Sequence, residues 1–226
     1  MQDARRLIIR FSIIEFVYYG ALAGGNYITN YLSGDLGFSS TVIGTVIAVG
    51  SLLAMASSLV FGSISDRLGS SRRVLVFCCG SAGVLYLMFP IFHLLGLRTL
   101  LPFCLLIPAV YLFRVPTMAL LDSWCNTEIA PHGINYGLIR LWGSAGFSIC
   151  SILISTFVVT IHTSLAFLWT FVAFVPLIIY VLRVKETVVP VRKTQKEKLQ
   201  LGKLFKNYYF MSYTMLTLAT NVHTAI

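Results

Sequence analysis

The sequence predicts an all-α integral membrane protein, and three observations lead to this fold class. Apolar residues make up 57% of the 226 residues and charged residues only 11%, whereas soluble domains have about 45–50% and about 25%. The mean hydropathy is high, at +0.83. Six apolar stretches follow one another, each near the roughly 20 residues that a helix needs to cross a bilayer. The pattern excludes a soluble enzyme, and it disfavours nucleic-acid binding despite the net charge of +9.

We expect six membrane-spanning helices, at residues 7–32, 40–64, 74–95, 99–124, 136–160 and 164–182. The first is a helix rather than a cleaved signal peptide, because Arg10 and Glu15 lie within it. The fourth contains Pro102, Pro108 and Pro116, which membrane helices tolerate where neighbours satisfy the freed carbonyl groups.

The composition divides the chain into three parts. We expect a six-helix transmembrane N-domain at residues 1–184, a basic cytoplasmic inter-domain loop at residues 185–206, and the start of a truncated helix seven at residues 207–226. Lys and Arg gather before helix one, between helices two and three, and in the long loop. Because cytoplasmic loops are enriched in Lys and Arg, we expect a cytoplasmic N-terminus.

Catalytic and metal sites are not indicated. The five cysteines and four histidines have neither metal-ligand spacing nor catalytic spacing. The sequence also contains no phosphate-binding GxxxxGK loop, which disfavours ATP-driven transport. We therefore expect no enzyme, no metal and no cofactor.

A charged turn connects helices two and three and runs from Gly62 to Arg73. Its glycines permit close helix approach and a tight reversal, its aspartate lies near a helix end, and its arginines hold the turn in the cytoplasm. The residues of this gating hairpin are Gly62, Asp66, Arg67, Gly69, Arg72 and Arg73.

The hairpin resembles the signature of the major facilitator superfamily, Gly-x-x-x-Asp-Arg/Lys-x-Gly followed by two basic residues. Ser70 and Ser71 separate Gly69 from the basic pair, where the family usually has one residue. The resemblance implies an N-terminal bundle of two three-helix inverted repeats. It also implies a substrate site near the midplane, between this half and a missing C-terminal half of helices seven to twelve.

The segment from Tyr136 to Phe147 is similar to the start of helix five in the proton-coupled oligosaccharide, lactose and phenylpropionate permease group. The resemblance implies that Asp122 and Arg140 contact the substrate, and that Phe147 is the stacking aromatic residue, a tryptophan in the lactose permease. It further implies a proton gradient as the driving force, with the proton-carrying residues mainly in the missing half. Nucleoside–proton symporters share a similar stretch, so the substrate stays open.

Helical periodicity supports the site in helix five. Arg140, Ser144, Phe147 and Ser151 follow at offsets of 0, 4, 7 and 11 and share one face. The face offers a fixed cation, hydroxyl groups and an aromatic ring, which suit hydroxyl pairs or carboxylates and the apolar side of a ring.

Helix one has a polar face and a small-residue face. Glu15, Tyr19 and Asn26 lie within about 40° of one another, so we expect a polar stripe that faces a cavity. Glu15 is either a proton or substrate site or the partner of a cation. Gly20 and Gly24 form a GxxxG pattern, which predicts close packing against a neighbouring helix.

Charges in helices four and five permit two interpretations. Asp122 and Arg140 either close a hairpin at the membrane surface or lie in the central cavity, where Asp122 holds substrate hydroxyls or pairs with Arg140. Arg114 lies about 80° around the helix from Asp122 and is a second possible partner.

These features predict proton-coupled symport of a small polar organic solute, a sugar or oligosaccharide first, by alternating access. The expected partners are the lipid bilayer, the solute, protons and the missing C-terminal half. We expect a multi-pass protein of the inner (plasma) membrane. The alternatives are a symporter for nucleosides or aromatic acids, a transport-incompetent gene fragment and a non-transporting membrane sensor.

Overall fold

The computed structural model describes residues 2–184 together with Tyr208, Met211, Ser212 and Met215. Within this part of the chain all regular structure is helical. The long helices are α1 (Gln2–Leu22), α3 (Ser40–Leu68), α4 (Ser71–Leu94), α5 (Leu100–Ile129), α6 (Tyr136–Leu153) and α7 (Leu165–Arg183). Short helical segments extend three of them, namely η1 (Ala23–Tyr27), α2 (Ile28–Asn30) and η2 (Tyr31–Asp35) after α1, η3 (Ala130–His132) after α5 and η4 (Ile154–Val158) after α6.

Among the described residues, six helical segments are long and apolar enough to cross a membrane, so the six predicted spans are confirmed. The fourth is longer than predicted, because it continues to His132 rather than ending at Trp124. The predicted loop at residues 185–206 lies outside the described residues, as does most of the predicted helix seven at residues 207–226.

Local sequence explains the tight turn between α3 and α4. Gly69 ends α3 with a φ of 59°, a left-handed conformation that glycine adopts without strain. Ser70 then caps α4, since its hydroxyl oxygen accepts a hydrogen bond of 3.3 Å from the backbone N–H of Arg73. Asn135 caps α6 in the same manner by accepting a hydrogen bond of 2.9 Å from the N–H of Gly137.

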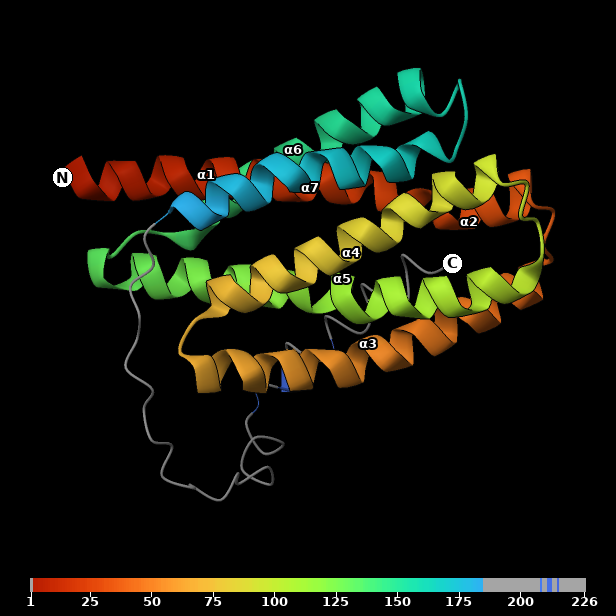
Figure 1. Ribbon diagram of the computed structural model, residues 1–226. Helices are drawn as coiled ribbons and strands as arrows, with labels where there is room; N and C mark the ends of the chain where they lie inside the picture. Colours follow the sequence, from red (N-terminus) through yellow and green to blue (C-terminus); the bar gives the residue numbers. More distant parts are fainter. Residues whose placement is uncertain (1, 185–207, 209–210, 213–214, 216–226) are drawn as a thin grey trace. The chain divides into compact units, whose positions relative to one another are not determined.

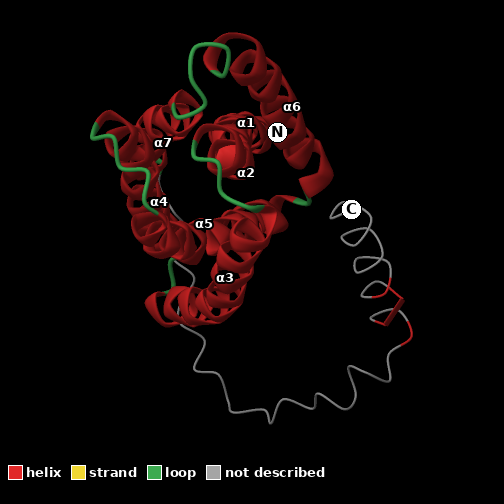
Figure 2. Ribbon diagram, turned by 90° about the vertical axis from the view of Figure 1, so that its right-hand side faces the viewer, coloured by secondary structure: helices red, strands yellow, loops and turns green. Residues whose placement is uncertain are grey.

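The six long helices pack with an internal symmetry. α1 lies at the centre of the bundle in the end-on view (Figure 2) and packs mainly against α6 and α7, while α5 packs against α3 and α4. The first three spans (α1, α3, α4) correspond in order to the last three (α5, α6, α7). The α1–α6 pair therefore corresponds to the α5–α3 pair, and the α1–α7 pair corresponds to the α5–α4 pair. Successive spans alternate in direction (Figure 1), so α1 and α5 run in opposite directions. This is the packing of two three-helix inverted repeats.

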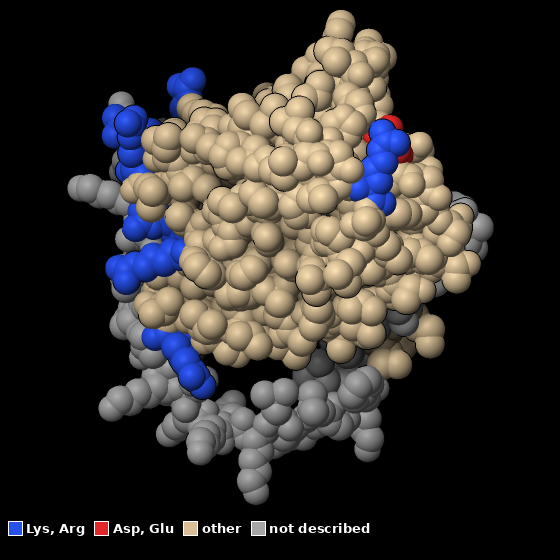
Figure 3. Space-filling view, turned by 45° about the vertical axis from the view of Figure 1, so that its right-hand side comes forward, with Lys and Arg blue, Asp and Glu red and all other residues tan. Residues whose placement is uncertain are grey.

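Basic side chains gather at one end of the bundle (Figure 3). The start of α1, the α3–α4 turn and the end of α7 lie together at one end (Figure 1). The arginines that these segments contribute are Arg5, Arg6, Arg67, Arg72, Arg73 and Arg183. The arginines of the six helices are thus concentrated at one end of the bundle. The prediction of a cytoplasmic N-terminus depends on this asymmetry of charge.

Glycines bring α1 into direct backbone contact with its neighbours. A β-carbon added at Gly20 would lie 2.7 Å from the sulfur of Cys150 on α6, and one added at Gly146 would overlap the carbonyl oxygen of Phe16 on α1. Gly24 meets the backbone of α7 in the same way. The close packing predicted from the GxxxG pattern is therefore confirmed.

We predict that Gly146→Ala destabilises the bundle by about 1–3 kcal/mol, because the new methyl group forces α6 away from the backbone of α1. The matched control is Gly44→Ala on α3, where an added β-carbon meets no atom within 4 Å. The control should be neutral or slightly stabilising, since alanine favours a helix by up to about 1 kcal/mol over glycine. Thermal unfolding of the purified variants in detergent measures both, and an equal midpoint for the two would contradict the contact.

Candidate functional site

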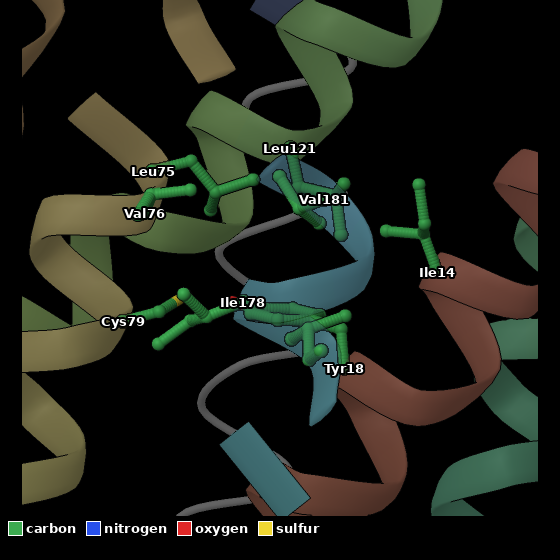
Figure 4. A pocket seen from close by; sticks show the side chains of 9 residues that line it. Ile14, Tyr18, Leu75, Val76, Cys79, Leu121, Ile178 and Val181 are labelled. Carbon is green, nitrogen blue, oxygen red and sulfur yellow. The ribbon is translucent and has the colours of Figure 1, made fainter. Parts of the chain in front are cut away.

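The interior between α1, α4, α5 and α7 gives no room to a solute. Apolar side chains from these four helices, Ile14, Leu75, Leu121 and Val181 among them, converge there (Figure 4) and leave a cavity of about 10 Å³. Such a cavity holds one water molecule at most. A cluster of charged and polar side chains lies elsewhere, where α1 meets α5 and α6.

A tyrosine hydroxyl connects these three helices. Tyr136, the first residue of α6, donates a hydrogen bond of 2.5 Å to Oδ1 of Asp122 on α5. The same hydroxyl lies 3.4 Å from Oε1 of Glu15 on α1. Glu15 is fully buried, whereas Asp122 is half-buried. Two carboxylates that are distant in sequence therefore share one hydroxyl group.

Arg140 completes the polar cluster from one turn further along α6. Its guanidinium carbon lies 3.9 Å from the centroid of the Tyr19 ring, in a cation–π contact. Among the described residues, neither Nη1 of Arg140 nor Oε2 of Glu15 has a hydrogen-bond partner. A β-carbon at Gly143 would lie 2.7 Å from the first atom and 2.9 Å from the second. The unpartnered donor of Arg140 and the unpartnered acceptor of Glu15 thus both lie close to Gly143 on α6.

The predicted pair between Asp122 and Arg140 is not among the contacts of the described residues. Asp122 binds Tyr136 instead, and the stack on Tyr19 draws the guanidinium of Arg140 towards α1. The alternative of a charge pair that closes a hairpin also fails. Helix α5 continues for seven residues beyond Asp122, which puts this carboxylate about 10 Å inside the helix end.

The other candidates of α6 border the cluster. Ser144 is exposed, and Phe147 is partly buried against the apolar clusters around α1. Arg140 is half-buried. Asp122, Arg140 and Ser144 therefore form the accessible edge of the site, with Glu15 and Tyr19 behind them.

Asn26 and Arg114 form a separate polar pair. Nη2 of Arg114 donates a hydrogen bond of 3.1 Å to Oδ1 of Asn26. Asn26 follows Glu15 by eleven residues, or about 16 Å along a helix, and it lies in the 3₁₀ segment η1, where the helical phase changes. The predicted stripe of helix one is thus divided into two clusters, and Arg114 pairs with Asn26 rather than Asp122.

The sequence did not single out Tyr136 and Gly143 as site residues. One signal was available, because Tyr136 precedes Arg140 by four residues and extends the same helix face by one turn. Gly143 could not be found in this way, since its role depends on the approach of α1.

The α3–α4 hairpin connects to the end of α7. Nη1 of Arg72 donates hydrogen bonds to the carbonyl oxygens of Val184 (2.5 Å), Leu182 (3.4 Å) and Val181 (3.5 Å). Asp66, Arg67 and Arg73 are exposed. The close approach expected at Gly62 is not found in the described part of the chain, because an added β-carbon there meets no atom within 4 Å.

In the part of the chain that the structure describes, no group of three or more His, Cys, Asp or Glu residues is arranged to hold a metal ion. The polar cluster is therefore a site for hydrogen bonding and charge, built from two carboxylates, one guanidinium and two tyrosines. Such a set can bind hydroxyl groups or hold a proton.

Comparison with known proteins gives one family and several relatives. The sequence model described as "MFS_1 like family" matches residues 8–221. Maltose permease of Geobacillus stearothermophilus is 29% identical over 140 residues, which cover 61% of this chain and 33% of the permease. The crystal structure of the nucleoside transporter NupG superposes with a TM-score of 0.70 at 18% identity and covers 95% of this chain and 54% of the transporter. A mutant of that transporter gives the same TM-score at 20% identity.

The fold of this chain is therefore that of a transporter half. The chain spans about half the length of the solved transporter, and the matched segment spans a third of the permease.

We predict that Arg72→Ala lowers the free energy of unfolding by about 1–3 kcal/mol, because carbonyl groups at the end of α7 lose a charged donor. Arg73→Ala is the matched control, since this neighbouring side chain is exposed, and it should change stability by less than about 0.5 kcal/mol. Equal losses in the two variants, measured by thermal unfolding in detergent, would show that Arg72 acts only as a surface charge.

We also predict that Tyr136→Phe destabilises the protein by about 1–3 kcal/mol, because the partly buried carboxyl group of Asp122 loses its hydrogen-bond donor. Tyr111→Phe on α5 serves as the control, since its partly buried hydroxyl has no hydrogen bond among the described residues. The same unfolding measurement applies, and a Tyr136→Phe variant as stable as the control contradicts the bond.

Proposed function

Because the chain belongs to the MFS_1 like family of the major facilitator superfamily, we propose that it supplies the N-terminal half of a proton-coupled symporter. The symporter carries a small polar organic solute across the plasma membrane by alternating access. Helices seven to twelve form the opposite wall of the substrate path, and the basic end of the bundle faces the cytoplasm.

The observation that carries this proposal is the pair of unpartnered groups beside Gly143. Buried polar groups in proteins almost always have hydrogen-bond partners. Within the described part of the chain, Nη1 of Arg140 lacks an acceptor and Oε2 of Glu15 lacks a donor. Both atoms are buried, so a ligand that carries both kinds of group reaches them only when side chains at the accessible edge, formed by Asp122, Arg140 and Ser144, move aside.

A sugar or oligosaccharide fits these requirements best. Each sugar hydroxyl both donates and accepts a hydrogen bond, and the partly buried ring of Phe147 offers an apolar surface for a sugar ring. Two carboxylates face one guanidinium in the cluster, which disfavours an aromatic acid by charge repulsion. The likeness to a maltose permease supports the same substrate class.

The proposal is tested with the full-length gene product in proteoliposomes under an inward proton gradient, with maltose, uridine and phenylpropionate as probes. We predict maltose uptake, and a loss of about 10–100-fold in Asp122→Asn and Arg140→Ala, since each removes a charged hydrogen-bond partner of the substrate. Arg10→Ala is the control, because this arginine is exposed on α1 and lies outside the cluster.

The other possible results of the uptake experiment lead to different conclusions. Uptake of uridine or phenylpropionate without maltose replaces the substrate class and keeps the symporter. Full uptake by both site variants removes Asp122 and Arg140 from the binding site. Failure of all probes, with a folded full-length protein, favours a sensor or a transport-incompetent gene product.

A further inference from the structure

We propose that Asp122, Tyr136 and Glu15 form a proton relay, in which Asp122 takes up a proton from water at the accessible edge of the site and Glu15 holds it. This inference rests on the proposed proton-coupled symport. It assigns a proton-binding group to the N-terminal half, whereas the resemblance to the permease group implies proton-carrying residues mainly in the C-terminal half.

The inference follows from the single hydrogen atom of the Tyr136 hydroxyl group. The Tyr136 hydroxyl approaches both carboxylates but has one hydrogen atom, so it can donate to only one of them. The contact of 2.5 Å with Asp122 uses this hydrogen. The contact of 3.4 Å with Oε1 of Glu15 is left without one. One additional proton, carried by Glu15, completes both contacts at once, because the tyrosine oxygen can then accept from Glu15 while it donates to Asp122.

Burial gives the relay a direction. Asp122 is half-buried and belongs to the accessible edge of the site, whereas Glu15 is 0% exposed. No described residue donates a hydrogen bond to Oε2 of Glu15 either. A proton from water at the accessible edge therefore reaches Glu15 by way of Asp122 and Tyr136 rather than directly.

The transfer balances in protons and bonds. A hydronium ion at the accessible edge of the site protonates Asp122 and leaves as water. The Tyr136 hydroxyl group then turns its hydrogen from Asp122 towards Oε1 of Glu15. Asp122 gives its proton to the Tyr136 oxygen, while Tyr136 gives its own hydroxyl proton to Oε1 of Glu15. Asp122 returns to a carboxylate, Tyr136 stays neutral and Glu15 becomes a neutral acid. For the transfer to Glu15 the contact of 3.4 Å must shorten to about 2.7–2.8 Å, the usual length of such a bond.

The neighbours of Glu15 connect the proton to the substrate site. The ionisable and charged side chains that face it are Tyr19 on α1, Asp122 and Cys125 on α5, and Tyr136 and Arg140 on α6. The ionisable side chains of α7, Tyr180 and Arg183, lie in its last turn. Arg140 is thus the cation of the cluster, and neutralising Glu15 removes a negative charge that attracts it. A guanidinium held less tightly against α1 is available to a substrate.

The first experiment measures the proton directly and needs no substrate. Purified full-length protein is acidified while its infrared spectrum is recorded in H₂O and D₂O. A protonated carboxyl group has a C=O stretch that a carboxylate lacks, and the band shifts on deuteration. We predict such a band in the wild type and its loss in Glu15→Gln. Glu128→Gln is the matched control, because Glu128 is another buried glutamate of the bundle.

The second experiment measures coupling in proteoliposomes, with maltose and uridine as probes. Exchange of solute at equal concentrations needs no net proton movement, whereas accumulation under a proton gradient does. We predict that Glu15→Gln lowers accumulation at least about tenfold, the range of a lost proton-transfer group, and leaves exchange within about twofold of the wild type. Tyr136→Phe keeps Glu15 but breaks the relay, so it should also lower accumulation of solute and leave exchange nearly unchanged. Glu128→Gln should accumulate solute as the wild type does.

The outcomes separate this inference from the proposed function. A Glu15→Gln variant that keeps the infrared band, or accumulates solute as the wild type does, overturns the relay. A wild type that exchanges solute without accumulating it overturns proton coupling, and a wild type inert to both probes overturns the substrate class. In these two cases the infrared band still decides whether Glu15 holds a proton. If Glu15→Gln does not fold, the accumulation and exchange of Tyr136→Phe decide the relay.

Discussion

The close approach of α1 to α6 is the constraint on which the rest of the site depends. Gly146 lies against the carbonyl oxygen of Phe16, and Gly20 lies against Cys150, so the two helices touch backbone to backbone. At this separation a tyrosine on α6 reaches a glutamate on α1, and an arginine on α6 stacks on Tyr19. A larger residue at either glycine would widen the gap and separate the polar side chains.

The inverted repeats show how specialised this interface is. The pair related to α1–α6 by the repeat is α5–α3, and it also uses a glycine, since a β-carbon at Gly50 would lie 3.2 Å from the Tyr111 ring. That contact is apolar. The fold therefore requires small residues at both interfaces, but only the α1–α6 interface brings buried polar side chains together. Because burying a charge in a membrane is costly, we attribute the polar interface to function rather than to folding.

Much of the fold and part of the site could be predicted from the sequence. Apolar stretches gave all six spans, but α5 was cut short at Trp124, because Asn126, Thr127 and Glu128 lower the local hydropathy. The structure shows that two of these residues bond back to carbonyl oxygens of α5 and the third accepts from Trp124, so the helix continues. Asn26 was misassigned for another reason, since an ideal helical period does not foresee the 3₁₀ segment η1.

The partners of the charged residues could not be predicted, because they depend on how helices cross. Their position as ionisable residues within apolar stretches singled out Asp122 and Arg140, and the resemblance to a permease group gave them a role. Neither source indicates that Tyr136 lies between Asp122 and Glu15, since this needs three helices in their final positions.

The relay connects two parts of the bundle that have few contacts with each other, the α1–α6 pair and α5. A movement of one part relative to the other would therefore affect the relay. Tyr136 and Glu15 lie on the closely packed α1–α6 pair, whereas Asp122 lies on α5, which has few contacts with α6. A shift of the α1–α6 pair relative to α5 would therefore lengthen the hydrogen bond to Asp122 and leave the distance from Tyr136 to Glu15 unchanged. Since hydrogen bonds weaken steeply with distance and angle, a small shift would disconnect the buried carboxyl group of Glu15 from the accessible edge of the site. A proton on Glu15 would then stay with the α1–α6 pair while the rest of the bundle moves, which is what coupling a proton to alternating access requires.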